Sequence, residues 1–143
     1  MIVQLVTSFI ASAGFAILFN APKRSLIQCG LVGMLGWMAY ILLLEQFDNI
    51  LATLVATVLV GVISQFFAKH YKMPVIIFSV SGIIPLVPGG LAYDAMRSFV
   101  QNDYTAAVQF GVQTFLLAGS IALGLILSEV LNQSFRKKTP PIS

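Results

Sequence analysis

The chain has 143 residues, of which 58% are hydrophobic and only 9% are charged, and its formal net charge is +3. A water-soluble domain usually carries about a quarter charged residues, and a globule of this size cannot bury so many apolar side chains. The composition therefore excludes an ordinary soluble domain and predicts an all-α integral membrane bundle with the lipid bilayer as its main solvent.

Several functional classes are disfavoured by the residues present. The basic residues fall in short clusters between apolar stretches rather than along one face, which argues against nucleic-acid binding. Cys29 has no partner for a disulfide, and the lone His70 is interpreted as a solvated residue of a basic loop rather than a metal ligand. No catalytic constellation or phosphate-binding loop is present. We expect no enzyme activity, no metal and no cofactor.

Charged residues divide the chain into five apolar stretches, each close to the roughly 20 residues that cross about 30 Å of hydrocarbon. No long polar linker separates these stretches, so residues 1–135 are predicted to form a single transmembrane domain. The predicted spans cover residues 2–20, 26–44, 50–68, 73–91 and 105–130, and a basic cytoplasmic tail covers residues 136–143.

The first stretch, Met1 to Pro22, is interpreted as a retained helix rather than a secretory signal peptide. No basic segment precedes its apolar run, and Lys23 and Arg24 follow the run instead. With the N-terminus outside, seven of the eight Lys and Arg residues fall in inside segments, and only Arg97 lies outside. This count predicts a multi-pass protein of the cytoplasmic (inner) membrane, with its N-terminus outside and its C-terminus in the cytoplasm.

The fourth stretch, Met73 to Tyr93, contains two prolines that must interrupt a helix. Pro85 and Pro88 lack amide hydrogens and clash with the preceding turn, so the carbonyls of Ser81 and Ile84 lose their ordinary helical hydrogen bonds. A fourth stretch that turned back would leave the basic C-terminal residues outside, so the charge count favours a full crossing.

Three glycines surround the same break. Gly82, Gly89 and Gly90 remove side-chain bulk and permit positive φ, so we expect backbone groups to be reachable by a small solute. Broken helices are tolerated in lipid where they are buried in protein or line a wet cavity, as in the substrate sites of many secondary transporters. The alternative is a simple proline kink or a helix end. The first candidates for a solute path are Ser81, Gly82, Pro85, Pro88, Gly89 and Gly90.

Other polar residues supply second candidates and a constraint on mechanism. No acidic or basic residue lies in the middle of a span, so a proton relay would need a group from another chain. Uncharged polar residues in spans usually hydrogen-bond between helices. Gln109 and Gln113 nevertheless lie one turn apart on one face, a face that could point at the broken fourth helix.

Between the fourth and fifth stretches, residues 92–103 predict a short amphipathic helix at the outer interface. Arg97 either guards an anion entrance or simply snorkels and pairs with Asp94, three residues away. The apolar residues at helical spacing are Tyr93, Met96, Phe99 and Val100.

Three segments resemble the threonine/serine exporter family: residues 15–25, residues 30–40, and residues 82–93 with their Pro-Leu-Val-Pro-Gly-Gly sequence. The chain is most similar to the short YjjB-type subunit, which corresponds to the C-terminal half of longer one-chain exporters. The resemblance implies export of a small polar or anionic solute, such as threonine, serine or a dicarboxylate like succinate, driven by the proton motive force. It also implies a second multi-span subunit that brings the titrating groups.

The resemblance marks two sets of positions in this chain. The motif of the fourth stretch carries over as Pro85, Pro88, Gly89 and Gly90, and the segment of unknown role carries over as Asn20, Pro22, Lys23 and Arg24. Two other functions remain open at this point. One is a non-transporting accessory protein that assembles another membrane complex, and the other is a homo-oligomeric channel.

Overall fold

The structure, a computed structural model, describes residues 1–136, and it is helical without any strand in that range. The all-α prediction is confirmed. The predicted basic tail lies outside the described residues from residue 137 onward. The elements are α1 (Ile2–Leu18), η1 (Lys23–Ser25), α2 (Leu26–Leu44), α3 (Asn49–Tyr71), α4 (Val75–Gly82), η2 (Ile84–Leu86), α5 (Gly89–Val100) and α6 (Tyr104–Arg136), where η denotes a 3₁₀ turn.

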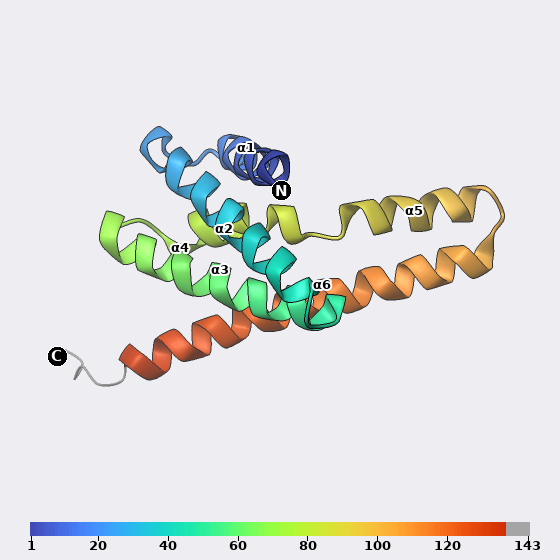
Figure 1. The fold of residues 1–143 in the computed structure, drawn as a ribbon. Helices are drawn as coiled ribbons and strands as arrows, with labels where there is room; N and C mark the ends of the chain where they lie inside the picture. Colours follow the sequence, from blue (N-terminus) through green and yellow to red (C-terminus); the bar gives the residue numbers. More distant parts are fainter. Residues whose placement is uncertain (137–143) are drawn as a thin grey trace.

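The helices form a bundle with a projecting arm (Figure 1). Helix α2 packs against α1, α3 and α4, and α3 packs against α4 and α6. Helix α5 packs against α6, and these two form a hairpin that extends past the turn between α2 and α3 (Figure 1). We call this hairpin, α5 together with residues 104–116 of α6, the arm. The rest of the chain is the bundle.

Length and composition identify several helices that can cross a membrane. Three segments qualify alone: Lys23–Leu44, Asn49–Tyr71 and Tyr104–Phe135. The pair Val75–Leu86 and Gly89–Val100 qualifies when taken together and is bent by 54°. Helix α1 is apolar but has only 17 residues. The chain is therefore a multi-pass membrane protein with three to four spans by this criterion.

Three helices end on the same local motif, with a residue of positive φ after the last turn. The φ angles are 62° at Asn20, 53° at Lys72 and 64° at Asn102. In each case the next amide donates to a carbonyl five residues back, which satisfies a carbonyl that the ended helix would otherwise leave free. These bonds are Ala21 N–H to Ala16 O at 3.0 Å, Met73 N–H to Ala68 O at 3.0 Å and Asp103 N–H to Ser98 O at 2.9 Å.

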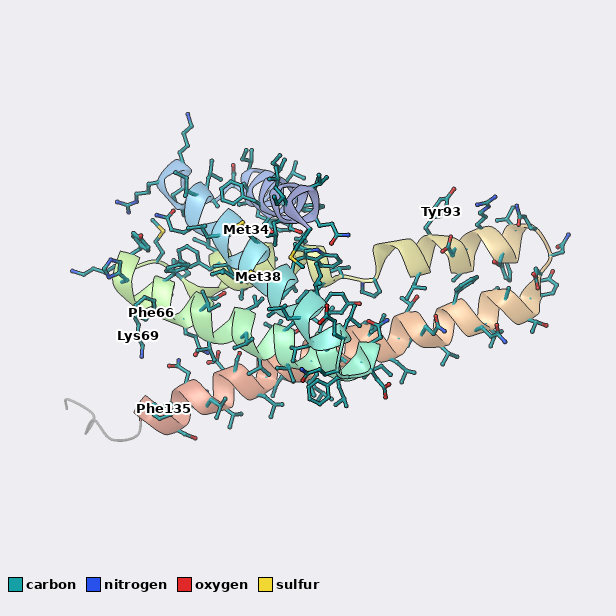
Figure 2. The ribbon with its side chains drawn as sticks, viewed as in Figure 1. Met34, Met38, Phe66, Lys69, Tyr93 and Phe135 are labelled. Atoms are coloured by element: carbon teal, nitrogen blue, oxygen red, sulfur yellow. The ribbon has the colours of Figure 1, made fainter. Side chains whose placement is uncertain are left out.

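Small residues let the bundle helices approach closely. A Cβ added at Gly33 would overlap Ser12 of α1, one at Gly61 would overlap Ser128 of α6, and one at Gly124 would lie 2.7 Å from Thr57 Cβ. Lipid gives helices no hydrophobic reason to associate, so close van der Waals packing of this kind holds membrane bundles together. Large apolar side chains point outward instead, as at Phe66 (Figure 2).

The turns that carry basic residues lie at one end of the bundle. The α1–α2 connection, the α3–α4 connection and the end of α6 all lie on the left in Figure 1, and Lys69 marks this end in Figure 2. The α2–α3 turn lies at the opposite end of the bundle, which is also the end from which the arm extends. Turns with and without basic residues alternate along the bundle part of the sequence, and the fold therefore brings the basic turns together at one end of the bundle.

Candidate functional site at the broken helix

Helix α4 ends at Gly82, near the mid-depth of the bundle. A Cβ at Gly82 would lie 2.9 Å from Val60 Cγ1, and Val60 is the middle residue of α3. Beyond this point the chain makes a 3₁₀ turn, in which the Ile84 carbonyl accepts a hydrogen bond from Val87 N–H at 3.3 Å. The break therefore occupies the half of the bundle away from the basic end.

A two-residue non-helical linker separates η2 from α5. Val87 has φ −63° and ψ 131°, and Pro88 has φ −79° and ψ 57°, so neither is helical. Helix α5 then begins as Ala92 N–H donates to the Pro88 carbonyl at 3.1 Å. Because Pro88 has no amide hydrogen, it is suited to a position just before a helix, where no intrahelical partner exists.

The glycines at the break have different surroundings. None of the glycines in the described chain has positive φ, so the expectation that Gly82, Gly89 and Gly90 permit positive φ at the break does not describe their role. Gly82 is needed for close approach, because a Cβ there would overlap Val32 of α2. Gly89 and Gly90 face open space, with nothing within 4 Å of an added Cβ. Ser81 is buried, and its hydroxyl donates to the Ile77 carbonyl of its own helix at 2.8 Å.

A recess of about 240 Å³ lies beside the break. It is smaller than the pockets that hold drug-sized ligands and is suited to a smaller solute. Helix α1 contributes three polar side chains, α2 contributes an indole, and η2 contributes one of the two prolines. The lining residues are Gln4, Thr7, Ser8, Ala11, Trp37 and Pro85.

The hydrogen bonds of the recess leave groups for a solute. The hydroxyl of Thr7 donates to the Val3 carbonyl at 2.9 Å, and that of Ser8 donates to the Gln4 carbonyl at 2.7 Å. Each hydroxyl oxygen keeps its acceptor capacity. The indole N–H of Trp37 is buried and has no hydrogen-bond partner. A buried unpaired donor costs about 1–3 kcal/mol, so a native partner for it is expected.

A second unpaired group lies one helical turn farther along α1. Ser12 is fully buried, and its Oγ has no hydrogen-bond partner. Its side chain faces Gly33 of α2, where an added Cβ would overlap it. Two unpaired polar atoms, one on α1 and one on α2, therefore lie close to the broken helix.

Comparison with known proteins now bears on this site. The sequence profile described as "Threonine/Serine exporter, ThrE" matches residues 4–131, which includes α1 through most of α6. The chain belongs to the threonine/serine exporter family. The resemblance to this family is thus confirmed, and the recess lies within the matched part of the chain.

One relative shows how much of a longer protein the chain matches. An uncharacterised protein of Haemophilus influenzae is 30% identical over 140 residues, covering 92% of this chain and 47% of the relative. The chain therefore spans about half the length of the curated relative that it matches. No solved structure matches it.

The polar face of α1 was missed at the sequence level. Gln4, Ser8 and Ser12 are four residues apart, so they lie on one face of a helix. This spacing was visible in the sequence, but only the contact of α1 with α2 and η2 shows that the face is turned toward the break rather than toward lipid.

Gln109 and Gln113 are not brought to the break of this exporter chain. Both are exposed on α6, in the arm. Gln113 lines a separate recess of about 290 Å³ at the α2–α3 turn, together with Asp48, Asn49, Ile50, Leu116 and Leu117. Gln113 therefore lies beside the α2–α3 turn rather than beside the break.

The matched segment of unknown role has a local structural function. Asn20 provides the positive φ that ends α1, and Pro22 follows two residues later with φ −57°, directly before η1. Lys23 and Arg24 then form the exposed basic turn that leads into α2. The segment is a helix stop joined to a charged loop, and none of its residues lines the recess at the break.

A third recess lies at the basic end. It has a volume of about 320 Å³ and is lined by Gln65, Ala68, Lys69, Lys72, Met73, Pro74, Val75 and Asn132. The amide of Gln65 donates to the Ser128 carbonyl at 3.1 Å, which ties α3 to α6 behind this recess. Two lysines make its surroundings positive. Within residues 1–136, no three His, Cys, Asp or Glu side chains gather where they could hold a metal ion.

Proposed function

We propose that this chain forms the membrane path of an exporter for a small polar metabolite, working with a complementary half that it does not contain. The observation that carries the proposal is the recess at the broken helix, which is lined by Pro85, by Thr7 and Ser8 of α1, and by Trp37, whose buried indole N–H has no hydrogen-bond partner. Membership of the exporter family supports it. The broken helix supports it as well, because a break at membrane depth is tolerated only where protein surrounds it or where it lines a wet cavity.

The proposed topology has five crossings of the cytoplasmic membrane. They are α1, α2, α3, the bent pair of α4/η2 with α5, and α6. The N-terminus is outside, and the C-terminal end of α6 is in the cytoplasm. This orientation is supported by the gathering of the basic turns at one end of the bundle, since cytoplasmic loops carry an excess of Lys and Arg.

The proposed solute is a zwitterionic amino acid such as threonine or serine rather than a dicarboxylate such as succinate. The recess at the break has no charged side chain in its lining. Moving a dianion from water into an uncharged site carries a large desolvation cost, whereas a zwitterion has no net charge. The indole N–H of Trp37 suits a carboxylate oxygen, and the α1 hydroxyl oxygens suit an ammonium or a side-chain hydroxyl.

The proposed driving force is the proton motive force, with titrating groups supplied by the complementary half. Helices α1 to α4, which surround the recess, contain no Asp or Glu. Intramembrane proton relays normally use such carboxylates. An exporter built from this chain therefore needs a partner for coupling.

Efflux from intact cells tests the proposal. Cells preloaded with labelled threonine, serine or succinate should lose threonine or serine faster when they carry this chain and its complementary half than when either is deleted. Unchanged efflux of all three solutes would contradict the proposal. An accessory protein would also leave efflux unchanged but would alter the abundance of another membrane complex. A homo-oligomeric channel would conduct in liposomes without any partner.

A further inference from the structure

The arm is longer than a membrane requires. Helix α6 has 33 residues and is therefore about 50 Å long, against about 30 Å of hydrocarbon. Even at a tilt of about 40°, near the upper limit for transmembrane helices, it would extend about 38 Å along the membrane normal. Its C-terminal part packs on α3 through Gly124 and Ser128, so the excess falls at its N-terminal end, in the arm.

The outward face of α5 is apolar. Tyr93 is 67% exposed, Met96 is 65% exposed and Val100 is 75% exposed, and their spacing of three and four places them on one face. Tyr93 points away from α6 in Figure 2. The opposite face, which includes Ala95 and Ser98, is partly buried against α6.

The outward face of α6 in the arm is apolar as well. The residues that α6 turns toward α5, such as Ala107 and Thr114, are partly buried. The exposed apolar residues follow at spacings of four, four and three: Tyr104, Val108, Val112 and Phe115, of which Phe115 is 82% exposed. Both helices of the arm thus expose apolar side chains outside their shared contact, and on α6 Gln109 and Gln113 are exposed beside them.

Lipid cannot cover the whole of this surface, because the outer part of the arm extends beyond the hydrocarbon in the proposed topology. Contiguous apolar surface outside lipid marks a protein interaction site. Among the helices of residues 1–136, only α6 makes extensive contact with α5. The arm is therefore built to be covered by something that the described chain does not contain.

We infer that the apolar faces of the arm dock the complementary half of the exporter. The relative from Haemophilus influenzae matches this chain over only 47% of its length, so it carries a further half within the same protein. The bundle also exposes large apolar side chains, on α1 for example, but these lie at the depth of the hydrocarbon in the proposed topology, so the outer part of the arm is the apolar surface that lipid does not cover. This inference rests on the proposed two-part exporter, and it adds the location of the contact.

Photo-crosslinking in membranes of the native host tests the inference. Benzoylphenylalanine replaces Tyr93 on the arm or Phe66 on the bundle, and the two positions are matched because each is 67% exposed. The inference predicts a protein adduct at Tyr93 that is at least about tenfold stronger than at Phe66. Its peptides should come from a multi-span protein or segment of the same exporter family. An adduct with a second copy of this chain, or equal lipid adducts at both positions, would overturn the inference.

A variant pair separates docking from folding. Met96→Ala with Val100→Ala should weaken the Tyr93 adduct by about tenfold, whereas Ile27→Ala with Phe66→Ala, which truncates bundle residues exposed to 65% and 67%, should leave it unchanged. Equal effects of the two pairs would count against the arm as the docking surface. Efflux of labelled threonine is measured in parallel. If the wild type forms the Tyr93 adduct but shows no efflux, the docking inference holds and the proposed function is wrong. If the wild type shows efflux but forms no adduct at Tyr93, the proposed function holds and the docking inference is wrong.

Discussion

Gly82 and Gly89 belong to one proline-glycine motif but have different physical roles. Gly82 lies between α2 and α3, where even one added methyl would overlap Val32. Gly89 begins α5 with open space around it. Residue type alone could not separate these roles, because both glycines lie within four residues of a proline in the sequence.

The first prediction compares alanine at these two glycines. Gly82→Ala should destabilise the bundle by about 1–3 kcal/mol, the usual cost of overpacking, because α2 or α3 must move. Gly89→Ala should be nearly neutral, since the new Cβ meets nothing within 4 Å. Thermal unfolding in detergent measures both. Equal shifts in Tm for the two variants would show that α2 and α3 do not pack against Gly82 as closely as the structure indicates.

The second prediction concerns the unpaired indole of Trp37. Trp37→Phe removes a buried donor that has no partner, so the folded state loses no hydrogen bond. If the indole N–H binds the solute carboxylate, the apparent KM for threonine efflux should rise by roughly tenfold, since a hydrogen bond to a charged group contributes about 1.5–3 kcal/mol. An unchanged KM would show that the Trp37 indole does not bind the solute. Ser64→Ala serves as the control, because that hydroxyl bonds only to the Val60 carbonyl at 2.6 Å, within its own helix.

At the level of whole elements, helix ends are encoded locally. Asn20, Lys72 and Asn102 all adopt positive φ, and two of the three helix ends are followed by a proline within two residues. Such signals depend only on neighbouring residues, which is why helix positions could be predicted from charges, prolines and apolar length. The tertiary placement of a helix face depends on contacts far along the chain.

The third prediction tests the helix stop at Asn20. Asn20→Gly should leave stability almost unchanged, because glycine accepts a φ of 62° without strain. Asn20→Val should cost about 1–2 kcal/mol, since a β-branched side chain is poorly tolerated in the left-handed region. Unfolding midpoints of the two variants provide the measurement. A loss of export in Asn20→Gly at unchanged stability would instead assign the side chain a functional role.

The candidate site shows where prediction from the sequence ends. Pro85 and Pro88 predict a break because they remove amide donors, and that argument needs no tertiary information. Gln4 and Ser8 could not be assigned to the same site, because nothing local says that α1 turns this face toward η2. Gln109 and Gln113 were grouped with the break by their spacing, but the arm carries them away from it.

For the molecule as a whole, the proposed topology rests on the separation of the basic turns from the other turns. The fourth prediction places single reporter cysteines at exposed positions in a Cys29→Ala background. Cysteines replacing Gln46 and Gln101 should react with an impermeant maleimide applied outside the cell, and one replacing His70 should react only after the cytoplasmic side is opened. Outside labelling at His70, or protection at Gln101 before opening, would contradict five crossings.

The difference between the bundle and the arm also fits an exporter made of two parts. The bundle buries its small residues and keeps an uncharged recess at a broken helix, whereas the arm leaves apolar faces without a partner. In the proposed exporter, this chain provides the solute path and the complementary half provides the titrating groups.

Transport in inverted membrane vesicles tests this account most directly. Vesicles containing this chain and its complementary half, energised to acidify their interior, should accumulate labelled threonine or serine, and a protonophore should abolish the accumulation. Vesicles lacking this chain should accumulate neither. If energised vesicles with both halves present and folded take up no threonine, serine or succinate above that background, the chain does not form the path of a proton-driven exporter.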